Sequence, residues 1–113
     1  MIDFNRMPCI YWSDATKVGF LQRYIIIHSI IYYELDENVI SDKEFDSTAR
    51  QLVKMQKQMG HRKLKDTMYY YCMHDFDGSS GFDLYGRLIP FDKKYLMQIA
   101  QNVLRCKKGL VAK

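Results

Sequence analysis

The side chains best suited to nucleophilic or metal chemistry are the cysteines and histidines, and their spacing argues against both kinds of site. They are Cys9, Cys72, Cys106, His28, His61 and His74. No two cysteines form the Cys-x-x-Cys pair of zinc and redox sites, and no histidine lies at ligand spacing from another ligand. We therefore expect no metal centre and no Cys–His nucleophile. Unpaired thiols are typical of a reduced compartment.

A second pattern with chemical capacity lies at residues 75–79, which read Asp-Phe-Asp-Gly-Ser after an apolar segment. It resembles the start of haloacid-dehalogenase-type phosphatases, in which the first Asp attacks phosphorus and the second acts as acid and base. That resemblance implies a parallel sheet and later catalytic residues, whereas the residues after Asp77 have a helical pattern. The segment also lacks the ligand positions of a calcium loop. We interpret it as a Gly-Ser turn capped by Asp75 or Asp77.

The elements that must position any site are predicted to be helices within one domain. A chain of 113 residues has room for a single domain. Its 48% hydrophobic and 27% charged residues are typical of a globular protein, and only two Pro and six Gly leave few turns for an all-β chain. We predict a mainly α fold. Residues 14–60 form an antiparallel helical hairpin, and residues 61–113 form an aromatic-rich connector, with short strands as an option, and one or two C-terminal helices.

The first hairpin helix is predicted over residues 14–34, with Ser13 or Asp14 as its cap. Apolar residues recur at the three- and four-residue spacing of one helical face. They are Phe20, Leu21, Tyr24, Ile27, His28, Ile31 and Tyr32. Because this run is long and amphipathic at both ends, we favour a helix over a strand despite its β-branched centre.

The second hairpin helix is predicted over residues 42–58. Ser41 and Glu44 have the spacing of a capping box, in which each side chain binds the other residue's backbone N–H. Gly60 is expected to end the helix in the left-handed conformation. The predicted buried stripe consists of Phe45, Leu52, Val53, Met55, Gln56 and Met59.

The second half of the chain has weaker signals. Residues 61–66 are interpreted as a solvated basic loop, and residues 68–73 as a short strand or an extended packing segment. Ser80 is expected to start a short helix, and Asp92 to cap a last helix over residues 93–105. The aromatic side chains expected to close the core are Tyr69, Tyr70, Tyr71, Phe76 and Phe82.

The most specific motif lies at residues 32–46, which read YYELDENVISDKEFD. It resembles the N-terminal helical-hairpin domain of NAD-dependent bacterial DNA ligases. That domain shows a Tyr-Tyr or Tyr-His pair, then Leu-Asp, a short turn, Ile-Ser-Asp, and Glu-Tyr-Asp at the start of the next helix. The resemblance extends over residues 21–57, roughly a third of the chain.

In those ligases the hairpin closes over the nicotinamide-mononucleotide half of NAD. The resemblance therefore implies ring stacking by Tyr32 and Tyr33 and polar contacts to ribose or phosphate from Asp42 and Asp46. Phe45 stands where the family has Tyr, so its place in such a site lacks one hydroxyl. Binding of NAD or nicotinamide mononucleotide through these five residues is one hypothesis for function.

A departure from the ligases concerns catalysis. Ligation needs a lysine nucleophile in a Lys-x-Asp-Gly motif, within a nucleotidyltransferase domain longer than this chain, and the sequence contains no such motif. We therefore expect neither a ligase nor another enzyme.

An alternative interpretation of the motif at residues 32–46 needs no ligand. Tyr32 and Phe45 pack across the hairpin, while Ser41, Asp42 and Glu44 cap the second helix.

The net charge of +4 is unevenly divided along the chain. Residues 14–60 hold six basic and seven acidic side chains, whereas residues 61–113 hold ten basic and five acidic ones. The expected partner surface is the acidic turn of the hairpin, formed by Glu34, Asp36, Glu37 and Asp42. A further alternative is nucleic-acid binding through Lys63, Lys65, Arg105, Lys107 and Lys108.

The function that we expect is that of a non-enzymatic protein-interaction module. A stand-alone domain of this kind resembles small accessory proteins of bacterial viruses and mobile elements. The resemblance implies a host replication or antiviral-defence protein as partner, in the bacterial cytoplasm. No apolar stretch reaches the ~20 residues needed to cross a bilayer, and residues 1–6 lack the pattern of a signal peptide.

Overall fold

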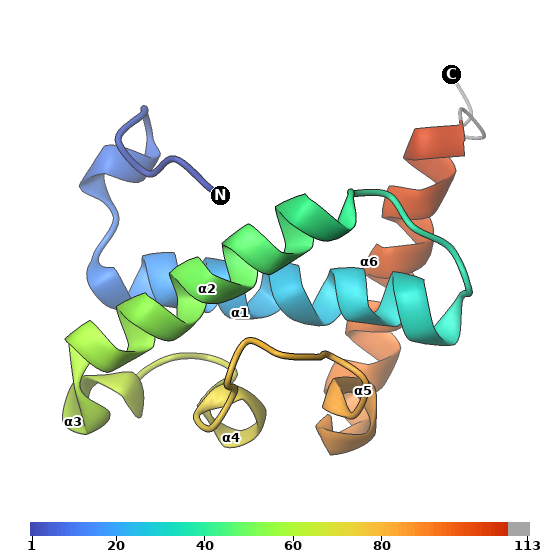
Figure 1. Ribbon diagram of the computed structural model, residues 1–113. Helices are drawn as coiled ribbons and strands as arrows, with labels where there is room; N and C mark the ends of the chain where they lie inside the picture. The colour runs from blue at the N-terminus through green and yellow to red at the C-terminus, as the bar shows by residue number, and fades with distance from the viewer. Residues whose placement is uncertain (109–113) are drawn as a thin grey trace.

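The protein is built from helices joined by short connections (Figure 1). The computed structural model describes residues 1–108, apart from the side chain of Lys108. This range contains no strand, so the predicted mainly α fold is confirmed and the optional short strands are wrong. In chain order the elements are η1 (Cys9–Tyr11), α1 (Asp14–Ser29), η2 (Ile30–Glu34), α2 (Asp42–Met59), α3 (His61–Leu64), α4 (Tyr70–Met73), α5 (Leu84–Arg87) and α6 (Pro90–Lys108).

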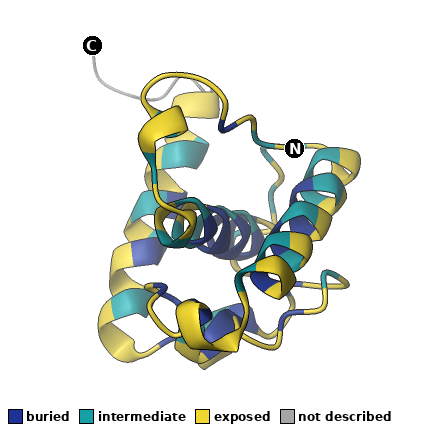
Figure 2. Cartoon of the chain, turned by 90° about the vertical axis from the view of Figure 1, so that its left-hand side faces the viewer, coloured by how far each residue is buried: buried dark blue, intermediate teal, exposed yellow. Residues whose placement is uncertain are grey.

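Helix α1 is the centre of the fold. It begins as predicted, because the Ser13 hydroxyl accepts a hydrogen bond from the Thr16 N–H at 3.2 Å and satisfies one free donor of the first turn. Viewed along its axis, α1 lies between α2 and α6 (Figure 2). The predicted single apolar face was too narrow, because a central helix is covered on several sides. Its buried residues are Val18, Leu21, Gln22, Ile25, Ile26, Ile27 and Ser29.

The end of this helix widens into the π-helical segment η2. The Leu35 N–H donates to the Ile30 carbonyl five residues earlier, at 3.1 Å, instead of to the carbonyl four residues earlier. Together α1 and η2 cover the predicted helix over residues 14–34. The wider turn interrupts the apolar periodicity, and Tyr32, predicted on the buried face, is 51% exposed.

Helix α2 returns across α1 and completes the hairpin (Figure 1). The Ser41 hydroxyl accepts from the Glu44 N–H at 3.1 Å, which confirms one bond of the capping box. The reciprocal bond is absent within the described residues. The Glu44 carboxylate instead lies 3.1 Å from the amino group of Met1 and 3.5 Å from the Thr48 hydroxyl. Gly60 ends the helix at φ 80° and ψ 155°, so its φ is positive as predicted but its conformation is not left-handed helical.

Two segments of the second half are helical where the sequence suggested otherwise. The predicted basic loop contains α3, whose Leu64 is buried. The predicted strand contains α4, because buried positions recur at Tyr69, Cys72 and Met73, the spacing of one helical face. A strand would have placed Tyr71 on the same face as Tyr69, but Tyr71 is exposed.

Helix α6 begins earlier and ends later than predicted. Its first residue is Pro90, a position where the missing N–H costs nothing. Asp92 therefore lies inside the first turn rather than at the cap, and its carboxylate accepts a hydrogen bond from the Tyr71 hydroxyl. Among residues 1–108, no helix has the length and apolar character required to span a membrane.

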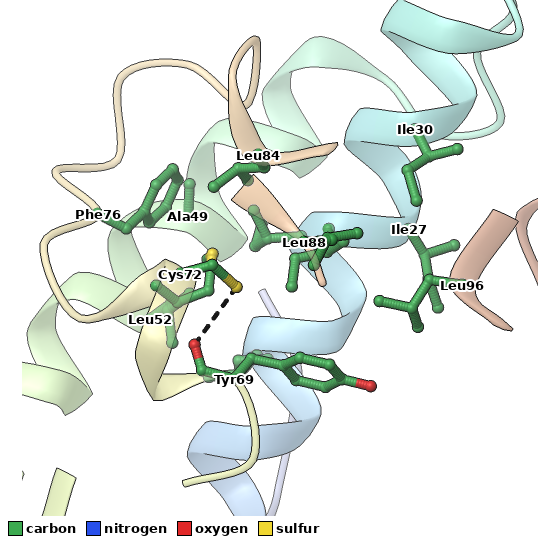
Figure 3. Close-up of a cluster of buried hydrophobic side chains, with 14 of the residues drawn as sticks. Ile27, Ile30, Ala49, Leu52, Tyr69, Cys72, Phe76, Leu84, Leu88 and Leu96 are labelled. Atoms are coloured by element: carbon green, nitrogen blue, oxygen red, sulfur yellow. Dashed lines mark hydrogen bonds between the residues drawn. The ribbon is translucent and has the colours of Figure 1, made fainter. Parts of the chain in front are cut away.

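The core joins these elements around α1 (Figure 3). Leu96 of α6 faces Ile27 and Ile30, while Phe76 lies beside Ala49 of α2. Tyr69 and Phe76 are buried, as predicted. Phe82 does not close the core, because it is 73% exposed. Tyr70 and Tyr71 of α4 are half-buried and exposed respectively.

Candidate functional site

Three residues of the predicted nucleotide site meet at the turn of the hairpin. Tyr32, Asp42 and Phe45 line one small cavity, together with His28. Its volume is about 30 Å³, whereas small-molecule pockets typically enclose roughly 300–1,000 Å³. Tyr32 and Phe45 thus border the same cavity, and their direct packing across the hairpin stays a prediction. The cavity is smaller than a mononucleotide.

The other two residues of that predicted site do not line the cavity, although the Tyr33 ring meets the Tyr32 ring edge-on at 4.8 Å between centroids. The Tyr33 hydroxyl is 3.1 Å from the Ser80 hydroxyl, and its ring meets Phe82 edge-on at 5.6 Å between centroids. Asp46 is exposed on α2 and does not line the cavity. Tyr33 therefore connects the hairpin to the segment before α5, whereas Tyr32 borders the small cavity.

The acidic turn has an unusual backbone and a basic neighbour. Asp36 adopts a positive φ of 54°, a conformation that Asp tolerates better than most residues. The Glu37 N–H donates to the Ile31 carbonyl at 3.0 Å, which closes the end of the helix. The Lys107 ammonium donates to the Asn38 carbonyl at 2.9 Å, so the end of α6 lies against the turn.

The basic residues of the predicted nucleic-acid surface do not gather on one face. Lys63 and Lys65 lie at α3, whereas Arg105 and Lys107 lie near the end of α6, on the opposite side of the molecule (Figure 1). The side chain of Lys108 is outside the described residues. A protein that follows a nucleic-acid backbone needs its cations on one surface. Here the predicted cations are divided into two separate groups.

The Asp-Phe-Asp-Gly-Ser segment is a turn with its carboxylates engaged. Both oxygens of Asp75 accept from the Arg87 guanidinium, at 2.6 and 3.3 Å, and this partner lowers the pKa of Asp75. Asp77 accepts from the Ser79 N–H and hydroxyl, which lowers its pKa as well. Gly78 has φ 84°. The turn interpretation is confirmed.

The cysteines and histidines form no constellation within residues 1–108. No group of three metal-ligating side chains is present there. Cys72 is buried, and burial, followed by the charge of Asp92, raises the pKa of its thiol to about 11. A thiol with that pKa is protonated near neutral pH and is a weak nucleophile.

The described residues also form a groove that the sequence did not reveal. It follows α1 from Ala15 to His28 and has a volume of about 630 Å³. Trp12 lies at one end, and Met68 and Tyr69 of the connector and Val103 of α6 complete its walls. We call it the α1 groove.

The groove carries a row of aromatic rings. The rings of Trp12 and Phe20 lie 5.6 Å apart between centroids, those of Phe20 and Tyr24 6.5 Å, and those of Tyr24 and His28 4.4 Å. The i, i+4 spacing of Phe20, Tyr24 and His28 was assigned to the core. Gly19 and Arg23, which flank that apolar face on one side, were the available signal that this edge of the face stays open.

His28 lies between the α1 groove and the small cavity of the hairpin. Its Nδ1 atom is buried and has no hydrogen-bond partner among the described residues. Burial lowers the pKa of His28 below its ordinary value of 6.5, and the charge of Glu44 opposes that shift. The neutral imidazole is therefore favoured in the folded protein.

We expect acidification to destabilise the protein through His28. Well above pH 6.5 the residue is neutral in both states. As the pH falls toward and below 6.5, the unfolded state takes up the proton first, because the pKa of His28 is lowered in the folded protein. The free energy of unfolding should therefore fall between pH 7.5 and pH 5, measured by urea denaturation at each pH. The His28→Phe variant should show a smaller fall. The exposed control His61→Gln should keep it, and an unchanged fall in His28→Phe would contradict the assignment.

The resemblance of residues 21–57 to the ligase hairpin stays a prediction. The structure adds that these residues form two helices joined by an acidic turn. Comparison with protein-family models, with curated proteins and with solved structures finds no match for this chain.

Proposed function

We propose that the protein is a non-enzymatic protein-interaction module that contacts its partner through the hairpin end. We define the hairpin end as Tyr32, Tyr33, Glu34, Asp36 and Asp42. The observation that carries the proposal is that all five side chains are exposed. None of the three carboxylates forms an ion pair with another described side chain.

The chemistry of this surface favours a basic partner. Carboxylates that are unpaired in the free protein attract a positive surface and accelerate association with it. Exposed tyrosines add apolar area and a hydroxyl at low entropic cost, which is why interfaces are enriched in them. A cluster of carboxylates carries negative charge, as the phosphates of a nucleic acid do. We therefore propose a nucleic-acid-processing host protein of replication or antiviral defence as the partner, bound by an accessory protein of a bacterial virus.

The test uses two aspartates in matched positions. Asp42 and Asp14 are each the first residue of a helix, each follows a serine cap, and both are exposed. Reversing either charge imposes a similar penalty on the helix dipole, but only Asp42 belongs to the hairpin end. We expect Asp42→Lys, combined with Glu34→Lys, to reduce capture of a bacterial partner roughly tenfold or more at low salt. Asp14→Lys should leave capture unchanged.

Capture is measured by pull-down from bacterial lysate, and the captured protein is then titrated in purified form. Asp36 is replaced by Asn rather than Lys, because Asn tolerates the positive φ at this position. The helical content of each variant is checked by circular dichroism. Equal binding by the Asp42→Lys/Glu34→Lys and Asp14→Lys proteins would overturn the proposal.

A further inference from the structure

We propose that the α1 groove binds a flat aromatic small molecule that carries an anionic group. This inference is independent of the proposed function, because the α1 groove and the hairpin end share none of the residues that define them. Three observations support it: the shape of the groove, the character of its walls and the charge at its rim.

The shape is that of a small-molecule site. A volume of about 630 Å³ lies within the roughly 300–1,000 Å³ typical of such pockets. Gly19 lies along the groove, and a Cβ atom placed on it would meet nothing within 4 Å. A side chain at this position would therefore occupy the groove without a clash.

The walls favour a flat apolar ligand. Trp12, Phe20 and Tyr24 follow one another along the groove, and each keeps part of its ring accessible, with Phe20 40% exposed. Aromatic side chains are rigid, present flat faces and stack on other rings in offset or edge-on arrangements. Their mutual contacts hold the rings in place before a ligand arrives, so the side chains lose little conformational freedom on binding.

The charge at the rim favours an anion. Arg23 is the only Lys or Arg that lines the groove within residues 1–108. Its guanidinium lies 5.7 Å from the centre of the Tyr95 ring and forms no ion pair with a described carboxylate. A guanidinium offers paired donors to a carboxylate, sulfonate or phosphate group. Asp66 also lines the groove, and the charge of Glu44 acts on Tyr24 and His28, so we expect the anionic group of the ligand at the Arg23 side of the rim.

The experiment uses two fluorescent probes with the same ring skeleton. 1-Anilinonaphthalene-8-sulfonate is anionic, and N-phenyl-1-naphthylamine is its neutral counterpart. We expect both probes to bind saturably with one site per chain. Arg23→Met should weaken the sulfonate probe roughly tenfold, the size of one charge-assisted contact, and the neutral probe less than twofold. Arg50→Met, the same change on an exposed residue of α2, should leave both affinities unchanged.

A second pair of variants tests the location. Gly19→Leu should abolish binding of both probes, because the side chain fills the groove, while the circular dichroism spectrum stays native and the melting temperature does not fall. Gly19→Ala should keep most of the binding and raise the melting temperature, because Ala favours a helix over Gly. The hairpin-end variants should bind both probes normally, which separates this proposal from the proposed function.

Three results would each overturn the inference. They are the absence of saturable binding by both probes, binding that survives Gly19→Leu, and equal loss of both probes in Arg23→Met. A different result would assign the groove to a protein partner. If the probes do not bind, and Gly19→Leu prevents capture of a protein in the pull-down, the groove is a protein-docking surface and the small-molecule proposal is wrong.

Discussion

Replacing Gln22 by Leu should lower the free energy of unfolding by about 3 kcal/mol, although the side chain keeps a similar volume. Gln22 lies fully buried on α1, where its Nε2 donates to Gln56 Oε1 at 2.9 Å and to the Thr67 hydroxyl at 3.1 Å. Its Oε1 accepts from the Tyr69 N–H at 3.3 Å. Leu would leave Gln56 Oε1 and the Tyr69 N–H without a partner, and each such buried group costs about 1–3 kcal/mol. The Thr67 hydroxyl keeps its bond to the Leu64 carbonyl at 2.7 Å.

Urea denaturation monitored by circular dichroism measures this loss. The matched control is Gln58→Leu, which makes the same change on an exposed face of α2 and should alter the free energy of unfolding by less than about 0.5 kcal/mol. The double variant Gln22→Leu/Gln56→Leu should lose less than the sum of the two single variants, because Gln56 Oε1 is no longer left unpaired. Equal stabilities of the Gln22→Leu and Gln58→Leu proteins would refute the role of the network.

Replacing Gly81 by Ala should destabilise the protein by about 3 kcal/mol, the upper range for overpacking. A Cβ on Gly81 would overlap the hydroxyl of Ser29 and lie 2.7 Å from the Ser29 Cβ. Ser29 is buried in α1, and its hydroxyl donates to the Ile25 carbonyl at 2.7 Å, so it cannot turn away without losing that bond. The new methyl group would push the segment before α5 away from α1.

A graded set of second substitutions identifies the clash. Ser29→Ala removes only the hydroxyl and should restore part of the stability lost in Gly81→Ala. Ser29→Gly removes the Cβ as well and should relieve more of the clash. Its gain in stability is reduced by about 1 kcal/mol, because Gly inside a helix is unfavourable. The control Gly86→Ala has open space around the added Cβ and should be neutral or stabilising. Thermal denaturation compares the series, and a Gly81→Ala protein as stable as Gly86→Ala would contradict this packing.

The features that the residue types predicted correctly are those formed by residues close together in the sequence. The cap at Ser13, the Ser41–Glu44 bond and the Asp77–Ser79 turn each join residues two or three positions apart. Such bonds form in the same way whatever surrounds them, so the residue types predicted them. The same patterns predicted the hairpin helices nearly to their ends.

Predictions that depended on distant residues were less successful. The aromatic composition of residues 68–73 predicts a short strand or an extended packing segment, but the segment contains the helical turn α4. Tyr32 was placed on the buried face because the pattern assumed an unbroken α-helix, and η2 changed the register. Residue type alone predicts Phe82 in the core, but its side chain is 73% exposed and its ring meets that of Tyr33 edge-on.

The sequence by itself determined that this chain is mainly helical and that its first two long helices are joined by an acidic turn, because capping and helical periodicity are local. Tertiary structure decided which sides of α1 are covered, because that depends on contacts such as Gln22 with Gln56, 34 residues apart. It also decided that the row from Phe20 to His28 borders an open groove. A helical face is core or binding surface according to whether another element covers it, and the spacing of residues along one helix is the same in both cases.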